Sequence, residues 1–417
     1  MAIEKVDALV VGGGQAGIAM SEHLGKAGLS HLVLEKKRIA ERWRSERWDS
    51  LVANGPAWHD RFPGMTFEGA SPNAFIPKEE VADYFEAYAR MIKAPVRTGV
   101  EVTRVTRLDR QTGFRAKTSE GIIEAETVIA ATGAFQTPVF PRLIPETGGL
   151  TQIHSTAYRN PDQLEDGAVL VVGAGSSGVQ IAEELLNAGR TTYLSVGSHN
   201  RPPRAYRGRD FCWWLGVLNK WDAEFVPGSE HVTIAVSGAF GGHTIDFRKL
   251  ADRGMTLVGM TRSCENGRLT FSDDLGQNIK AGDDDYLALL NEADAYVDAY
   301  GLDLPPEPEA KIIGPDPDCV ANPLLELDLQ QAGITTVIWA TGFDRDYSWL
   351  EVDAFDETGA PKHQRGVSVV SGVYFLGLPW QTRRGSSFIW GVWYDARYLS
   401  DHIVKQRNYR LYTPVAE

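Results

Sequence analysis

The sequence predicts an α/β protein with two nucleotide-binding units, and two repeated patterns carry this prediction. A short apolar strand leads into a Gly-x-Gly-x-x-Gly turn at residues 12–17 and again at residues 173–178. A helical segment comes after each turn, which is the order expected of a phosphate-binding turn between a parallel strand and its crossover helix. A strand that ends in Ala-Thr-Gly also occurs twice, at residues 131–133 and 340–342. We therefore expect two dinucleotide-binding, Rossmann-like domains.

The first turn has the residues that a bound diphosphate requires. The first glycine permits the tight turn, the second lets the diphosphate approach the backbone, and the third lets helix and strand pack closely. The diphosphate would rest on the helix N-terminus, where free N–H groups favour anions. The expected contacts are Gly12, Gly14, Gln15, Ala16 and Gly17. The next strand ends at Glu35, whose carboxylate can bind ribose hydroxyls and would repel a 2′-phosphate, so we assign FAD to this site.

The second turn differs from the first in the residues after its next strand. Its expected cofactor contacts are Gly173, Gly175, Ser176, Ser177 and Gly178. The next strand ends at Ser198 without an acidic residue, and Arg201 and Arg204 come shortly after it. Guanidinium groups bind phosphate well, so these three residues predict a site for the 2′-phosphate of NADPH. The alternative for the two arginines is a solvated basic loop.

The order of these patterns predicts a discontinuous first domain. We expect residues 1–160 and 325–417 to form the FAD-binding domain. Residues 165–324 form the inserted NADPH-binding domain, with an insertion rich in Trp and Arg at about 200–250. Apolar residues at helical spacing predict helices at 79–93, 284–300 and 393–404. Short strands are expected within 102–128 and at 373–377.

Composition excludes several classes of function. The 417 residues carry a formal net charge of −13 and no run of Lys or Arg, which argues against nucleic-acid or anionic-membrane partners. No apolar run approaches the ~20 residues that span a bilayer. The three cysteines are isolated, so neither a disulfide framework nor a C-x-x-C redox pair is expected, and no metal-binding motif is present. We expect a soluble, cytoplasmic protein without a metal.

Tryptophan is abundant, with 11 residues in the chain. Three groups lie near positions 43–58, 213–221 and 380–393. Large aromatic side chains of this kind usually form core and interfaces. The same residues would also suit aromatic walls around a flavin and a planar or apolar substrate.

Together these motifs resemble the class B flavoprotein monooxygenases, over nearly the whole chain. The resemblance rests on the two glycine turns, the loop Arg42-Trp43-Arg44-Ser45-Glu46-Arg47-Trp48-Asp49-Ser50, the segment His154-Ser155-Thr156-Ala157-Tyr158 and the two Ala-Thr-Gly turns, the second followed by Phe343. It implies an enzyme in which NADPH reduces FAD and the reduced flavin reacts with O2 at its carbon C4a to oxygenate a small organic substrate. The further cofactor contacts that it implies are Arg42, Trp43, Trp48, Thr132, Gly133, Ala340, Thr341 and Gly342.

The resemblance also implies two catalytic candidates. Asn54 falls at the place of the family's flavin-side asparagine, although Asn54-Gly55-Pro56 is also typical of a simple turn. His154 lies in the segment that links the domains and couples NADPH binding to flavin chemistry, and we do not expect it to transfer a proton itself. A histidine at this place also suits a purely structural linker.

Departures from the family pattern bear on the reaction subtype. The chain has Tyr158-Arg159 where Baeyer–Villiger enzymes have Trp-Pro, which favours oxygenation of nitrogen, sulfur or activated carbon. Ala40-Glu41 replace the usual Gly-Gly of the flavin loop. The alternative is a flavin reductase or oxidase that inserts no oxygen atom, because the two nucleotide sites fit it equally well. Neither the substrate nor the oligomeric state can be derived from the sequence.

Overall fold

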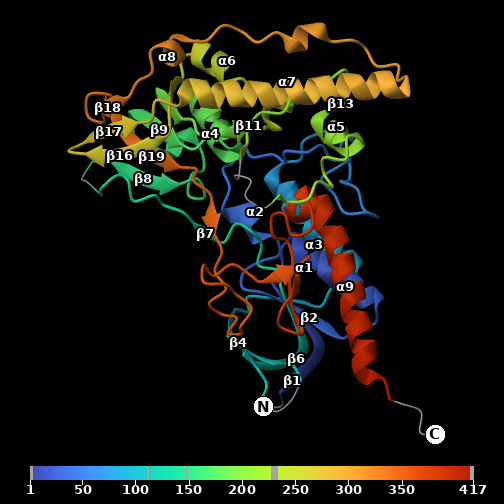
Figure 1. Ribbon diagram of the computed structural model, residues 1–417. Helices are drawn as coiled ribbons and strands as arrows, with labels where there is room; N and C mark the ends of the chain where they lie inside the picture. The colour runs from blue at the N-terminus through green and yellow to red at the C-terminus, as the bar shows by residue number, and fades with distance from the viewer. Residues whose placement is uncertain (1–2, 110–111, 147–148, 227–232, 414–417) are drawn as a thin grey trace.

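A parallel sheet forms the centre of each half of the molecule (Figure 1). The computed structural model describes residues 3–109, 112–146, 149–226 and 233–413. The gap at 227–232 falls inside the expected Trp/Arg-rich insertion, so that part of the insertion lies outside the described residues. The α/β class and the parallel sheets agree with the prediction of Rossmann-like domains.

The first sheet has nine strands. Its parallel strands are β23 (Val373–Phe375), β6 (Gly121–Ala130), β1 (Glu4–Val11), β2 (His31–Glu35) and β3 (Val96–Thr98), in that order. Antiparallel strands extend it, namely β4 (Val102–Arg107), β5 (Phe114–Thr118), β21 (His363–Gln364) and β22 (Val367–Ser368). The strands expected within 102–128 and at 373–377 are therefore present.

Helices cover one face of this sheet, and an antiparallel layer covers the other. The helices are α1 (Gln15–Lys26), α3 (Lys78–Met91) and α9 (Ile389–Leu411), and they bury one core with β1 and β2. The opposite core lies between the sheet, the β4–β5 hairpin and the segment 347–355. A short helix, α2 (Glu41–Ser45), comes after β2. The helices expected at 79–93 and 393–404 correspond to α3 and α9.

The second sheet has five strands, all parallel, and repeats this plan. Their order is β15 (Thr256–Val258), β10 (Thr192–Ser195), β9 (Ala168–Val172), β19 (Ile334–Trp339) and β8 (Thr151–His154). The helices that pack on one face are α4 (Ser176–Asn187), α6 (Phe247–Asp252) and the first part of α7 (Leu275–Tyr300). A three-stranded antiparallel sheet covers the other face, formed by β16 (Thr261–Glu265), β17 (Arg268–Phe271) and β18 (Glu326–Asp328).

The remaining short elements connect these layers. They are α5 (Phe211–Val217), α8 (Asp318–Ala321) and three two-stranded ribbons, which pair β7 (Thr137–Pro138) with β20 (Phe343–Asp344), β11 (His199–Asn200) with β14 (Thr233–Ile234), and β12 (Ala205–Tyr206) with β13 (Arg209–Asp210). The β7–β20 ribbon lies where the two halves meet (Figure 1). Each of its strands comes shortly after one of the two Ala-Thr-Gly turns.

Three strands depart from the expected domain boundaries. Residues 151–160 and 325–339 were expected in the first domain, but β8 and β19 pair in the second sheet, and β18 pairs with β17 in the antiparallel sheet that covers it. The register explains why β8 and β19 join the second sheet. Ile338 of β19 pairs with Val171 of β9 on one side and with Ile153 of β8 on the other, so the three side chains form one continuous apolar face. Apart from these three strands, the division into domains stays a prediction.

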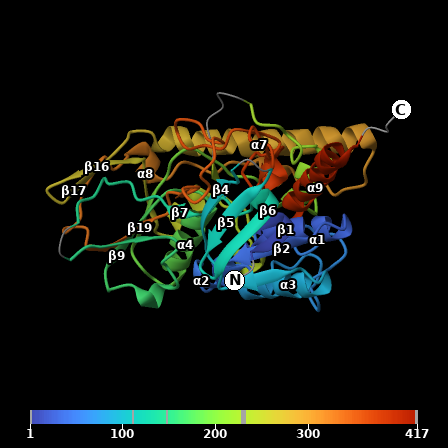
Figure 2. The same ribbon diagram turned by 90° about the horizontal axis from the view of Figure 1, so that it is seen from below.

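Helix α7 is longer than expected. The prediction began at residue 284, whereas the helix begins at Leu275 and spans the upper edge of the molecule in Figure 1. Gly282 weakens the helical signal in this stretch, but a Cβ there would lie 2.5 Å from the His199 imidazole, so the close approach requires glycine. The helix ends at Gly301, which has a φ of 59° and forms a left-handed cap. Figure 2 shows α7 and α9 along the same side of the molecule.

Candidate functional site

The two glycine turns have nearly the same geometry. Gly12 has a φ of 113° and Gly173 a φ of 110°, and a Cβ would lie 2.5 Å from the Ala131 carbonyl oxygen in the first turn and 2.6 Å from that of Ala340 in the second. In each turn the last glycine, Gly17 or Gly178, packs against the carbonyl of the first. Each Ala-Thr-Gly segment therefore abuts its own glycine turn. Ala340, Thr341 and Gly342 thus lie at the second turn, not in the first domain where the prediction placed them.

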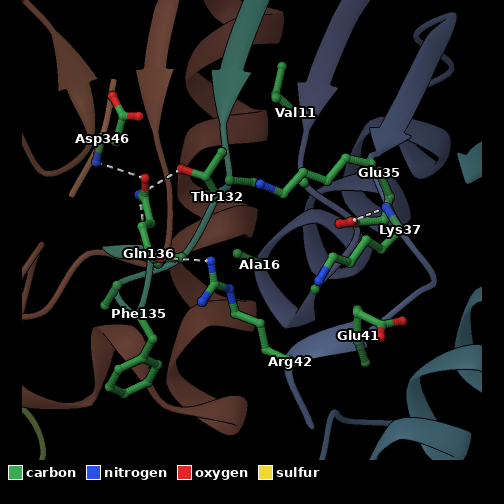
Figure 3. Close-up of a pocket in the computed structure, with 18 of the residues that line it drawn as sticks. Val11, Ala16, Glu35, Lys37, Glu41, Arg42, Thr132, Phe135, Gln136 and Asp346 are labelled. Atoms are coloured by element: carbon green, nitrogen blue, oxygen red, sulfur yellow. Dashed lines mark hydrogen bonds between the residues drawn. The ribbon is translucent and has the colours of Figure 1, made fainter. Parts of the chain in front are cut away.

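A cavity of about 530 Å³ runs along the first turn (Figure 3). Nine of the predicted cofactor contacts line it, namely Gly12, Gly14, Gln15, Ala16, Glu35, Arg42, Trp43, Thr132 and Gly133. A Cβ built on Gly14 would meet nothing within 4 Å, so the helix N-terminus of α1 is open to the cavity. Glu35 accepts hydrogen bonds from the backbone N–H groups of Gly13 (2.7 Å) and Lys37 (2.8 Å), which hold its carboxylate beside the turn. These features fit the diphosphate and ribose of a dinucleotide.

Sequence reasoning missed several residues of the cavity. Gln136 donates to the Thr132 hydroxyl (2.9 Å) and to the Gly133 carbonyl (2.8 Å), while its side-chain oxygen accepts from the Asp346 N–H (3.0 Å) (Figure 3). Arg42 forms an ion pair with Glu46 (2.5 Å) and also donates to the Gln136 carbonyl. Gln136 thereby ties the strand end after β6 to a residue 210 positions away. No local motif predicts such a contact.

Arg47 also lines the cavity, and none of the described residues forms an ion pair with its guanidinium. Its Nη1 donates to the Glu46 carbonyl (2.8 Å), and its guanidinium lies 5.3 Å from the Phe135 ring centre. Burial lowers the pKa of Arg47 to about 10, so the group remains charged at neutral pH. An unpaired cation in such a place is costly, and an anionic cofactor would compensate it.

We expect Arg47→Met to weaken FAD binding about tenfold, equivalent to ~1.4 kcal/mol, because it removes a positive charge from the cavity. Arg47→Lys should restore much of the affinity. Fluorescence titration of the apoprotein with FAD measures both. The control is Lys249→Met, which removes an exposed cation on α6. Equal affinities in the Arg47→Met variant and this control would contradict the expectation.

Trp48 and Gly17 do not line the cavity. Trp48 is buried in the core of the second sheet, together with Leu51, Tyr158 and Val179. Its prediction as a cofactor contact is therefore corrected to a core position. Trp43 packs against the cores of both sheets and also lines the cavity, so it alone of the two tryptophans has the expected place.

The second turn is partly covered by a crossing segment. The Ser176 hydroxyl donates to the Ile234 carbonyl (2.7 Å), and a Cβ on Gly175 would lie 3.3 Å from the Thr233 Cβ. Thr233 in turn donates to the Ser198 carbonyl (3.2 Å). Ser176 and Ser198 are thus both bonded to residues 233–234, and Ser177 follows Ser176 in the first turn of α4. A diphosphate at this turn would compete with residues 233–234.

Arg201 and Arg204 do not have the predicted environment. Arg201 is 4% exposed, and its Nε and Nη2 donate to one carboxylate oxygen of Asp283 (2.9 and 2.6 Å). Arg204 is 5% exposed, and its Nη2 donates to both carboxylate oxygens of Asp210 (2.6 and 2.8 Å). Both guanidiniums are therefore structural, and their assignment to the 2′-phosphate is corrected. The sequence after β10 indicated two positively charged residues, but it did not show which acidic residues pair with them.

His154 lies at the end of β8, next to the second Ala-Thr-Gly turn. Its Nε2 is 3.1 Å from the Gly342 carbonyl oxygen and its Nδ1 is 3.1 Å from the Thr156 hydroxyl, and its ring contacts Phe140 and Phe343. Burial lowers the pKa of His154, and the hydrogen bond to the Gly342 carbonyl only partly offsets this effect. The ring is therefore neutral at pH 7, which agrees with a linking role and not with a proton donor.

This lowered pKa predicts a pH dependence of stability. As the pH falls below about 6.5, the unfolded chain binds the proton on His154 before the folded protein does, so the free energy of unfolding decreases. His154→Gln should remove this contribution, so the loss of stability between pH 7 and pH 5 should be smaller in the variant than in the wild type. Urea unfolding of both proteins across this range measures the difference. Parallel pH profiles would show that His154 is not the source.

Asn54 lies in the loop after α2 and contacts helix α4. Its side-chain oxygen accepts from the Gln180 amide (2.8 Å), and its carbonyl accepts from Arg204 (2.6 Å). It is not among the residues that line the 530 Å³ cavity. The structure thus places Asn54 at a contact between the two halves, and its role in oxygen chemistry stays a prediction.

Comparisons with known proteins agree with this geometry. Residues 9–207 match the family model described as pyridine nucleotide-disulphide oxidoreductase. An oxidoreductase of Geobacillus kaustophilus (strain HTA426), described as CzcO-like and uncharacterized, is 36% identical over 406 residues, which is 96% of this chain and 98% of that relative. The chain belongs to the same oxidoreductase family as this CzcO-like relative. The match of its first half to the pyridine nucleotide-disulphide oxidoreductase model implies a flavin and a nicotinamide cofactor.

The chain is also similar to proteins named as flavin monooxygenases. The Arabidopsis thaliana protein named "Probable indole-3-pyruvate monooxygenase YUCCA4" is 24% identical over 406 residues, covering 95% of this chain and 90% of its own length. The solved flavin-containing monooxygenase of Stenotrophomonas maltophilia is 20% identical with a TM-score of 0.67, covering 97% of this chain and all of that one, and it shows the shared fold. No helix in the described residues is long and apolar enough to cross a membrane, and no cluster of candidate metal ligands occurs among them.

Proposed function

We propose that the protein is an NADPH- and O2-dependent flavin monooxygenase that oxygenates a small organic substrate. The observation that carries the proposal is the repeated turn geometry, in which two glycine turns of the same form each abut an Ala-Thr-Gly segment. One chain with two such turns can bring a reducing nucleotide and a flavin together. The three cysteines are unpaired and form no C-x-x-C motif, so no dithiol is available to carry electrons onward.

The chain's own residues bind and orient the two cofactors in this proposal. Residues 12–17 would hold FAD, with the α1 N-terminus binding the diphosphate and Glu35 binding a ribose hydroxyl. Residues 173–178 would hold NADPH, because no carboxylate at the end of β10 would repel a 2′-phosphate. When bound, the flavin supplies the redox chemistry with NADPH and O2.

Asn54 and His154 influence the reaction in this proposal without forming a covalent bond to a reactant. Asn54 supplies a side-chain amide donor at the contact between the halves. His154 remains neutral and links the second Ala-Thr-Gly turn to β8, so that NADPH binding is coupled to the flavin site. The absence of a Trp-Pro sequence after residue 157 favours oxygenation of nitrogen, sulfur or activated carbon over Baeyer–Villiger chemistry.

Rapid mixing tests the proposal directly. The flavin-loaded protein is reduced anaerobically with NADPH and mixed with oxygenated buffer without substrate, while flavin absorbance and hydrogen peroxide are recorded. We expect reoxidation in two phases, with peroxide released only in the slow second phase. A single fast phase with one peroxide per flavin would instead establish the alternative, a flavin reductase or oxidase.

A further inference from the structure

Three contacts hold the turn that contains Asn54 in place. The Gln180 amide bonds to its side chain, Arg204 bonds to its backbone carbonyl, and the next N–H, that of Gly55, donates to Asp60 (2.9 Å). Arg204 is itself fixed by Asp210 and lies between the rings of Phe75 (4.7 Å) and Phe211 (4.4 Å). Gln180 and Arg204 both come from the second half of the molecule. The backbone and the side chain of Asn54 are therefore each anchored by a separate residue of that half.

The hydrogen-bond pattern determines which way the Asn54 amide faces. Gln180 Nε2 donates to the Val236 carbonyl (2.7 Å), and a backbone carbonyl can only accept. The atom of Gln180 at this position must therefore be nitrogen. Its second hydrogen points to Asn54, so the Asn54 atom that faces it must be Oδ1. The Asn54 Nδ2 group is consequently turned away from α4, and no described residue accepts a hydrogen bond from it.

Residues 233–236, which cross the second glycine turn, connect the hydrogen bond between Gln180 and Asn54 to that turn. Ser176 and Gln180 are four residues apart on α4 and share one face of the helix. Ser176 donates to the Ile234 carbonyl and Gln180 to the Val236 carbonyl, so residues 233–236 run along this face. A nucleotide that competes for Ser176 therefore acts on the segment that also fixes Gln180.

We propose that Gln180 is a positioning residue that fixes the Asn54 amide with its nitrogen directed away from α4, in the orientation that the donor role proposed for Asn54 requires. The inference rests on the proposed function, because it concerns the donor that Asn54 supplies there. Gln180 acts only through Asn54 and contacts neither substrate nor cofactor in this role. The residue that orients the donor thus belongs to the helix that begins at the NADPH turn.

Replacing the Gln180 amide by a carboxylate tests this orientation. Gln180→Glu keeps the shape of the side chain but removes its donors, so Asn54 must turn its Nδ2 toward residue 180. We expect the hydrogen peroxide released per NADPH oxidised to rise at least as far as in Asn54→Ala. The rise should be larger at high pH, where the introduced carboxyl group is ionised. Gln331→Glu is the matched control, because it places the same new charge on an exposed residue, and it should leave the peroxide yield unchanged.

A stability measurement provides a readout that does not depend on activity. Urea unfolding of the flavin-free protein is compared for Asn54→Ala, Gln180→Met and the double variant. If the two side chains act as a unit, the double variant loses less stability than the sum of the single variants. The peroxide yield should be non-additive in the same way.

The outcomes separate this inference from the proposed function. A wild-type enzyme that reoxidises in one fast phase overturns the proposed function and the positioning role with it. A wild-type enzyme that reoxidises in two phases, with a Gln180→Glu variant of normal peroxide yield, overturns the positioning role alone. Strictly additive losses of stability and of coupling also overturn it, because they would show that Gln180 and Asn54 act independently.

Discussion

Gly17→Ala is expected to prevent the first glycine turn from forming. A Cβ at this position would lie on the Gly12 carbonyl, far inside the contact distance. The Gly12 carbonyl has little room to move, because the Gly12 N–H is bonded to Leu34 (2.8 Å) and its Cα faces the Ala131 carbonyl. We expect a loss of about 3 kcal/mol in the free energy of unfolding, together with loss of flavin. Urea unfolding and the flavin content of the purified protein measure the two effects.

Gly14→Ala is the matched control for this prediction. A Cβ at Gly14 meets nothing within 4 Å, and the residue has a φ of −83°, so the fold should lose no more than ~1 kcal/mol. The added methyl group enters the cavity at the helix N-terminus, so FAD affinity should fall by roughly 10–100-fold, the equivalent of one charged hydrogen bond. The pair thus separates folding of the turn from cofactor binding. Similar stability losses in both variants would contradict the geometric argument.

The glycine turns were predictable because their constraints are local. The first glycine of each turn has a positive φ, and the last glycine lies so close to the first that a Cβ would not fit. Both constraints act within a short segment, so they require a glycine spacing that the sequence shows directly, and the structure contains this turn twice. The position of Glu35 beside the first turn was predictable for the same reason, since this residue ends the next strand. These residues account for much of the cavity lining that the sequence identified.

The contacts between distant segments could not be predicted in this way. β8 and β19 join the second sheet through the pairing of His154 with Trp339, 185 positions apart in the chain. Asp283, the partner of Arg201, is 82 positions away, and Gln180 is 126 positions from Asn54. In each case the sequence shows a residue type suited to the site but not the partner that determines its role.

Asp283→Leu is expected to be the most destabilising change in the second half of the molecule. Asp283 is 5% exposed and lies between two guanidiniums, with Arg201 on one oxygen (2.6 Å) and Arg248 on the other (2.7 Å). Leucine would leave both cations buried without this partner, at a cost of about 3–5 kcal/mol. The control is its neighbour Asp284, which is exposed and paired with Lys280, so Asp284→Leu should change stability by less than ~1 kcal/mol. Urea unfolding of the two variants measures the contrast.

A variant of Arg201 at the same site distinguishes a structural role of this arginine from a role in cofactor binding. Arg201→Met leaves Asp283 paired with Arg248, so the fold should be weakened but retained. If Arg201 is structural, the variant binds NADPH and NADH with the wild-type ratio of affinities, whatever its stability. If Arg201 instead bound the 2′-phosphate, affinity for NADPH would fall while affinity for NADH stayed unchanged. Titration of the folded variant with each nucleotide decides between them, because a guanidinium already held by a buried carboxylate has no free donor pair to offer a phosphate.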